Sequence, residues 1–189
     1  MPGRRIVQRA EFRGAGRPPV LCTGGMTTFS SGSPRTTTGR DWLVLLGFLV
    51  LCYAVAGLGS LATLGNVDGW YATAEKPPFN PPNWLFGPVW TVLYGMIAVS
   101  GWLLWLRRAK PALLAWSVQL VLNLLWTPAF FGLELLWPAF ATILALDAAV
   151  VWTIVRARAV RPVAAWLLVP YLGWILFASV LNASLAVLN

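Results

Sequence analysis

The sequence predicts an all-α membrane protein, a bundle of five transmembrane helices in one domain. The first observation is composition: 58% of the 189 residues are hydrophobic, 11% are charged, and histidine is absent. A soluble domain of this length would need far more polar residues to cover its surface. The second is that five apolar runs can each cross a hydrocarbon core about 30 Å thick, which takes roughly 20 helical residues. Because lipid offers the backbone no hydrogen-bond partner, these runs must be helical.

The first 40 residues differ in composition from the rest of the chain. They are rich in Arg, Gly, Ser, Thr and Pro and contain one acidic residue. They lack the apolar core of a secretory signal peptide, and their glycines and prolines interrupt the amphipathic helix of an organellar transit peptide. We expect a disordered tail at 1–40 and the transmembrane domain at 41–189. Two alternatives stay open: a transit peptide, and a chain that truly starts at Met26.

The positions of the basic residues predict the topology of the five spans. The expected spans are Trp42–Leu64, Val89–Leu106, Ala112–Phe131, Leu135–Val155 and Pro162–Leu188. The tail and the second and fourth loops then share one side and carry 13 of the 14 basic residues, seven in the tail and three in each loop; Lys76 is the fourteenth. Positive loops mark the cytoplasmic side. We expect the N-terminus inside and the C-terminus outside, in a bacterial cell membrane or alternatively an organellar one.

The net charge of +8 is explained by this topology and by attraction to lipid headgroups, and it calls for no nucleic acid. Membrane lipid is therefore the expected surrounding partner.

A proline-rich segment, KPPFNPPNWLFGPVW at Lys76–Trp90, joins the first two spans. Proline fixes φ at about −65° and cannot continue a helix. Pro77, Pro78, Pro81 and Pro82 therefore predict a stiff, extended or turned segment. We expect this outward loop to cover an internal pocket; a plain hairpin connection at the membrane surface is the alternative.

Three spans carry polar and aromatic residues at helical spacing. These are Trp90 and Tyr94 on the second span, Gln119, Asn123, Trp126 and Phe130 on the third, and Tyr171, Trp174, Ala178 and Asn182 on the fifth. Buried amides in lipid cost several kcal/mol unless they are paired, so these faces should point inward. They either hold the helices together or line a cavity for a flat, largely apolar ligand.

Asp147 is the acidic residue that lies well inside an expected span. An ionisable side chain within a membrane is expensive and normally finds a partner. We expect it to face another helix, protonated or hydrogen-bonded, in a mainly structural role.

Three stretches carry a resemblance to a known family. They are GWYATAEKPPFNPPNWLFGPVWTVLYGM, QLVLNLLWTPAFFG and VPYLGWILFASVLN. Together they resemble the TspO/MBR family, the tryptophan-rich sensory proteins and peripheral-type benzodiazepine receptors, over about residues 42–182. The resemblance implies five tightly packed helices with the first loop as a lid over a pocket, and many members form homodimers.

The resemblance also implies ligands and site residues. The ligands are porphyrins, chiefly protoporphyrin, other tetrapyrroles and, in some members, sterols or synthetic benzodiazepine-type compounds. The matching positions are Trp70, Tyr71, Pro77, Phe79, Pro81, Trp84, Trp90, Tyr94, Asn123, Trp126, Trp174 and Ala178. Phe79 stands where many members have tryptophan, and the end of the last span, VLNASLAVLN, lacks the sterol-recognition motif.

The function implied is binding or sensing of tetrapyrroles, linked to their metabolism and to stress regulation. Without histidine, haem iron lacks its commonest axial ligand, so we expect a metal-free porphyrin as ligand, no cofactor and no metal site. Lys76 and the amides that begin the second helix would face the porphyrin carboxylates.

Catalytic machinery is not visible in the sequence. There is no Ser/His/Asp set, metal-ligand cluster or nucleotide-binding fingerprint of the kinds that mark hydrolases and ATP-driven transporters. Two alternatives to simple binding stay open. One is light- and oxygen-dependent porphyrin degradation, in which the resemblance implicates Trp70 and Trp174; the other is transport of porphyrin or of a lipid such as a sterol.

Overall fold

The computed structural model describes residues 38–63 and 69–189. The predicted tail lies almost entirely outside this range, and so do residues 64–68 of the first loop. Within the described residues every regular element is a helix, and five segments are long and apolar enough to cross a membrane: Gly39–Leu61, Asn83–Leu106, Lys110–Gly132, Leu136–Val160 and Pro162–Leu188. This confirms the predicted all-α, five-span membrane protein.

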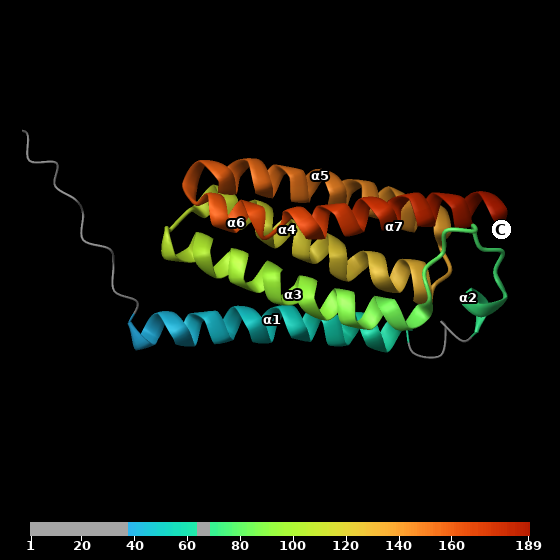
Figure 1. Cartoon of the computed structure of the whole chain (residues 1–189), viewed down its shortest axis with the longest axis horizontal. Helices are drawn as coiled ribbons and strands as arrows, with labels where there is room; N and C mark the ends of the chain where they lie inside the picture. Colours follow the sequence, from blue (N-terminus) through green and yellow to red (C-terminus); the bar gives the residue numbers. More distant parts are fainter. Residues whose placement is uncertain (1–37, 64–68) are drawn as a thin grey trace, which may run out of the picture. The chain divides into compact units, whose positions relative to one another are not determined.

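Eight helical elements make up the described part of the chain. They are α1 (Gly39–Thr63), α2 (Trp70–Thr73), α3 (Asn83–Leu106), α4 (Lys110–Thr127), the π-helical turn η1 (Pro128–Gly132), α5 (Leu136–Val160), α6 (Pro162–Trp166) and α7 (Val169–Leu188). The long helices run side by side, and α2 lies with the first loop at one end of the bundle (Figure 1).

The two ends of the bundle differ in charge. We call one end the basic side; its residues are Arg40, Arg107, Arg108, Lys110, Arg156, Arg158 and Arg161. The opposite end, formed by α2 and residues 69–82, is the loop side (Figure 1). Lys76 lies on the loop side, as the sequence predicts.

The second membrane helix starts earlier than predicted, at Asn83 rather than Val89. Pro82 has φ −58° and ψ 140°, which is polyproline geometry, and it directly precedes the helix. Pro88 is the sixth residue of the helix, and its missing N–H removes one backbone bond. The non-helical part of the proline-rich segment is therefore shorter than expected, and Trp84 belongs to the first turn of α3.

The last span is interrupted where the sequence predicted one continuous helix. It divides into α6 and α7, with Leu167 and Leu168 between them. Pro170 in the first turn of α7 has no N–H to donate and restricts the residue before it. The Leu168 amide instead bonds the Ala165 carbonyl at 3.0 Å, which is a tighter turn.

Glycine sets the tight packing of α1, α3 and α4 towards the basic side. A Cβ on Gly101 would lie 2.6 Å from Trp116 and 2.8 Å from Phe48, so only glycine lets the two rings approach α3. The Trp116 indole donates a hydrogen bond to the Ile97 carbonyl at 3.0 Å. These contacts join the three helices.

Candidate functional site

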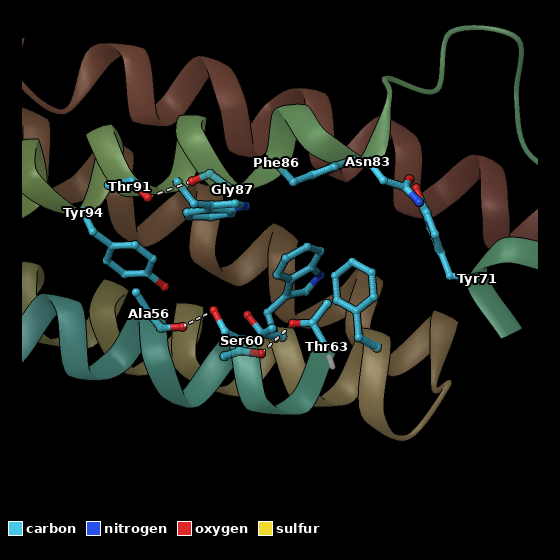
Figure 2. A pocket seen from close by; sticks show the side chains of 14 residues that line it. Ala56, Ser60, Thr63, Tyr71, Asn83, Phe86, Gly87, Thr91 and Tyr94 are labelled. Carbon is cyan, nitrogen blue, oxygen red and sulfur yellow. Dashed lines mark hydrogen bonds between the residues drawn. The ribbon is translucent and has the colours of Figure 1, made fainter. Parts of the chain in front are cut away.

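A cavity of about 390 Å³ lies on the loop side, between α1, α3 and the α4–η1 segment. Figure 2 shows α1 on one side of it and α3 on the other. Its lining residues are Ala56, Gly59, Ser60, Thr63, Tyr71, Asn83, Phe86, Gly87, Trp90, Thr91, Tyr94, Trp126, Thr127 and Phe131. The volume falls within the range of roughly 300–1,000 Å³ that is usual for small-molecule sites.

Aromatic rings form the α3 and α4 walls of the cavity. Trp90 and Tyr94 are one helical turn apart on α3, and their ring centroids lie 5.5 Å apart. Trp126 on α4 contacts Phe131, with centroids 6.2 Å apart. The π-turn adds a residue to the turn that follows Trp126, and Phe131 lines the cavity while Phe130 stacks on Trp126 outside it. Such walls suit a flat ring system.

Small residues form the α1 wall. The α1 residues that line the cavity lie on one face of the helix, at the spacing i, i+3, i+4, i+7: Ala56, Gly59, Ser60 and Thr63. The hydroxyl of Ser60 donates to the Ala56 carbonyl at 3.0 Å, and that of Thr63 donates to the Gly59 carbonyl at 2.6 Å. Both hydroxyls donate to carbonyls of their own helix (Figure 2). Neither donor on the α1 wall therefore needs a hydrogen bond from a ligand.

A buried polar chain lies behind the cavity. The Tyr94 hydroxyl donates to the Asn123 Oδ1 at 2.6 Å, and the Asn123 amide donates to the Tyr171 hydroxyl at 2.8 Å. Separately, Trp126 Nε1 donates to Asn182 Oδ1 at 3.2 Å, and Asn182 donates to the Leu136 carbonyl at 2.9 Å. Both asparagines therefore link helices, which is one of the two roles that the sequence leaves open.

The described part of the first loop is held at the cavity by Trp70 and Tyr71. Tyr71 is buried and donates from its hydroxyl to Asn80 Oδ1 at 2.7 Å. Burial raises the pKa of the Tyr71 phenol above its ordinary value, against the lowering effect of the bond to Asn80. Trp70 Nε1 donates to the Phe131 carbonyl at 3.1 Å. Lys76 lies over the Tyr71 ring, with its Nζ 4.9 Å from the ring centroid.

The loop has a third attachment, to α7. The Glu75 backbone N–H donates to Asn189 Oδ1 at 3.0 Å, and Asn189 Nδ2 donates back to the Glu75 carbonyl at 3.1 Å. Two reciprocal bonds to one residue hold the loop in register with the end of α7.

A second aromatic cluster adjoins the cavity on its α7 side. Phe79 of the loop contacts Phe177 with centroids 6.3 Å apart, Phe177 contacts Trp174 at 5.7 Å, and Trp174 contacts Phe86 at 5.8 Å. Phe86 also lines the cavity. The buried Nε1 of Trp174 has no hydrogen-bond partner among residues 38–63 and 69–189.

The structure brings together four of the predicted site residues, Tyr71, Trp90, Tyr94 and Trp126, at the cavity wall. The remaining predicted residues do not line it: Trp70, Lys76, Pro77, Phe79, Pro81, Trp84, Asn123, Trp174 and Ala178. Pro77 and Ala178 are buried, whereas Trp84 is 72% exposed. Contacts of any of these residues with a ligand stay predictions.

Sequence reasoning missed the contribution of α1 altogether. The predicted site residues are mostly aromatic or polar, whereas the residues that α1 contributes to the cavity wall are small. The segment AGLGSLAT places Ala56, Gly59, Ser60 and Thr63 on that face, which would have indicated a hollow. The other lining residues that it missed are Asn83, Phe86, Gly87, Thr91, Thr127 and Phe131.

Asp147 lies where the sequence predicts, facing another helix. Its Oδ2 accepts a hydrogen bond from the Ser179 hydroxyl of α7 at 2.8 Å, and the side chain is buried. No group of three or more His, Cys, Asp or Glu that could hold a metal ion occurs in the part of the chain that the structure describes.

Known proteins match the chain over most of its length. The model of the TspO/MBR family matches residues 48–188. The tryptophan-rich protein TspO of Archaeoglobus fulgidus is 43% identical over 153 residues, which are 78% of this chain and 97% of the relative. The tryptophan-rich sensory protein of Cereibacter sphaeroides is 36% identical over 155 residues, 79% of this chain and 93% of the relative. The translocator protein of Homo sapiens is 35% identical over 147 residues, 75% of this chain and 87% of the relative. With its five membrane-spanning helices, this chain belongs to the TspO/MBR family.

Proposed function

We propose that this integral membrane protein binds tetrapyrroles, protoporphyrin first, as a receptor or sensor. The observation that carries the proposal is the cavity of about 390 Å³ with Trp90, Tyr94, Trp126 and Phe131 in its walls. A flat, conjugated ring gains about 0.5–1.5 kcal/mol from each aromatic contact beyond its buried area. The small-residue face of α1 leaves room for the ring plane opposite these side chains.

One end of the cavity suits the edge of a porphyrin that carries its carboxylates. Asn83, the first residue of α3, lines the cavity, and the amides of a helix N-terminus attract carboxylates. Lys76 lies next to Tyr71, which also lines it. We therefore orient the carboxylates towards the loop side and the ring towards Trp90. Without histidine in the chain, a metal-free ring suits this site better than haem.

Sensing accords with the name of one relative, the tryptophan-rich sensory protein. Other relatives are called translocator proteins, so transport of a porphyrin or lipid is an alternative for the same cavity. The proposal includes the orientation with the basic side in the cytoplasm, because positive loops are retained there, a bacterial cell membrane, and pairing of two chains as in many family members.

One observation favours a second candidate, light- and oxygen-dependent porphyrin degradation. The buried Trp174 indole keeps an unused N–H among the described residues, and its ring contacts Phe86, which lines the cavity. An indole so placed could be oxidised by O₂ that a light-excited porphyrin activates. The Trp70 N–H, in contrast, already bonds Phe131, which gives Trp70 an anchoring role.

The test is quenching of intrinsic tryptophan fluorescence by protoporphyrin in detergent or nanodiscs, with a sterol as control. We expect saturable quenching by the porphyrin alone. Quenching that never saturates, or equal quenching by the sterol, would show the proposal to be wrong. Porphyrin absorbance followed in light and in darkness separates degradation from binding, and uptake into proteoliposomes tests transport.

A further inference from the structure

The interface of α1 with α3 is closed on the basic side. Trp102 of α3 donates from Nε1 to the Asp41 carbonyl of α1 at 2.9 Å and stacks on Trp42 with ring centroids 5.6 Å apart. Phe48 fills the space over Gly101. This half of the interface leaves no passage between the two helices.

The two helices are hydrogen-bonded at Tyr53. Its hydroxyl donates to the Thr91 carbonyl at 3.1 Å, and a Cβ on Gly95 would lie 3.2 Å from that hydroxyl. Towards the loop side, both helices contribute walls of the cavity.

The cavity reaches the flank of the bundle in this open half. Ser60 of α1 and Gly87 and Thr91 of α3 line the cavity and are nevertheless exposed. Helix α1 also buries the smallest share of its span, 17% against 39–44% for the other four spans of the described residues. The exposure of these lining residues indicates a lateral opening between Ser60 and Gly87.

The depth of the opening places it in the lipid. Thr91 is the ninth residue of α3, so at a rise of about 1.5 Å per residue the opening lies within about 12 Å of the helix end. Ser60 precedes the last residue of the first span, Leu61. Acyl chains of the loop-side leaflet surround this depth of a hydrocarbon core about 30 Å thick.

We propose that the gap between α1 and α3 on the loop side is a lateral portal through which the ligand enters from the acyl chains of that leaflet. This inference rests on the proposed function, since it assigns the route and class of the same ligand. Its rim is Ser60, Gly87 and Thr91. The ligand class is a flat molecule that partitions into the bilayer before it meets the protein.

The chemistry of the rim fits the passage of an apolar ring. The Ser60 hydroxyl donates to the Ala56 carbonyl at 3.0 Å and the Thr91 hydroxyl donates to the Gly87 carbonyl at 2.8 Å. Both donors are satisfied within their own helices, so these two hydroxyls do not have to give up a hydrogen bond when a ring passes. Gly87 has no side chain with which to narrow the gap from the α3 side.

The test is Gly87→Leu, measured by stopped-flow quenching with protoporphyrin in nanodiscs. A Cβ on Gly87 meets no atom of the described chain within 4 Å, so the leucine fits without strain and improves helix propensity. We expect both the association and the dissociation rate constants to fall at least about tenfold, because an obstructed passage slows entry and exit alike. Ser60→Leu obstructs the portal from α1 and should act in the same direction.

Two matched controls have the same chemistry away from the portal. Gly57→Leu on α1 and Gly173→Leu on α7 also add a side chain where nothing in the described chain lies within 4 Å, and neither residue lines the cavity. Both should leave the rate constants unchanged. Unaltered rates in Gly87→Leu, equal slowing in the controls, or faster dissociation without slower association would each overturn the portal. Failure of wild-type protein to bind would instead overturn the proposed function.

The source of the ligand is tested with a second probe. A tetrasulfonated porphyrin has the same ring but stays in water, so it should quench the wild-type protein far more slowly than protoporphyrin. Equal rates for the two porphyrins would mean entry from the aqueous phase and would overturn the lateral route.

Discussion

The two halves of the α1–α3 interface use the same pair of helices and reach opposite results. On the basic side α1 presents Phe48 to Gly101 of α3, and the rings close the space. On the loop side α1 presents Ala56 and Gly59, and the same helices enclose a cavity opposite Trp90. Aromatic residues are abundant in both halves. The size of the side chain on α1 therefore decides whether a tryptophan of a neighbouring helix packs closely against its surroundings or lines a cavity.

The largest expected effect comes from Gly101 in the closed half. Gly101→Ala would force a methyl group to 2.6 Å from Trp116, and overpacking of this kind costs about 1–3 kcal/mol of unfolding free energy. Gly87→Ala, where the Cβ meets no described atom within 4 Å, should stabilise α3 by up to about 1 kcal/mol. Denaturation with sodium dodecyl sulfate, followed by circular dichroism, measures both. Equal changes would contradict the assignment of Gly101 as the closing contact.

The next effect converts the open half into a closed one. Ala56→Phe places a ring inside the cavity, and the affinity for protoporphyrin should fall at least about tenfold, which is 1.4 kcal/mol. Ala54→Phe is the matched control, because Ala54 is exposed and does not line the cavity. Fluorescence titration of both variants provides the comparison. Undiminished binding by Ala56→Phe would place the ligand elsewhere.

Trp116, which packs on the closed half, and Trp174 of α7 give a smaller, double contrast. Trp116→Phe loses the bond to the Ile97 carbonyl and should lower the unfolding free energy by about 1 kcal/mol while porphyrin binding persists. Trp174→Phe removes an N–H that has no partner in the described structure, so it should cost little stability and weaken binding severalfold. Trp166→Phe, at a 72% exposed residue, should change neither. The same stability loss in Trp116→Phe and Trp174→Phe would show that both indoles serve packing alone.

The smallest effect concerns the attachment of the loop to α7. Asn189→Ala removes both bonds to the Glu75 backbone, at a cost of about 1 kcal/mol or less because the site is exposed. Hydrogen exchange at the Glu75 amide should become faster while global stability hardly changes. Ser184→Ala removes a bond within α7 only. Faster exchange at Glu75 in that variant would argue against the attachment of the loop through Asn189.

The sequence predicted the five spans and the inward faces because hydropathy and helical spacing depend on local order alone. It placed Trp174 with the cavity-lining residues, whereas in the structure Trp174 does not line the cavity and contacts Phe86, which does. Spacing gives the face of a helix but not which of two neighbouring rings stands in front. That order depends on how α3 and α7 pack.

The break in the last span and the early start of α3 were missed for a related reason. Proline limits a helix, but Pro170 lies in the first turn of α7, where proline is tolerated, and Pro88 lies inside α3. Only the neighbouring backbone bonds decide between a start, a kink and an end. The face of small residues on α1 could have been predicted from their helical spacing. The surface of α3 and α4 that lies opposite could not, because it depends on how the helices pack.

The π-turn η1 has a consequence for insertions and deletions. Its backbone bond from the Leu133 amide to the Pro128 carbonyl spans five residues, one more than in an α-helix. The Phe131 carbonyl next to it accepts the Trp70 indole that anchors the loop. Deleting one residue here would restore regular winding and rotate the following chain by about 100° relative to Trp126, since each residue turns an α-helix by that angle. The number of residues in η1 therefore determines both the direction in which Phe131 faces the cavity and the hydrogen bond that attaches the loop.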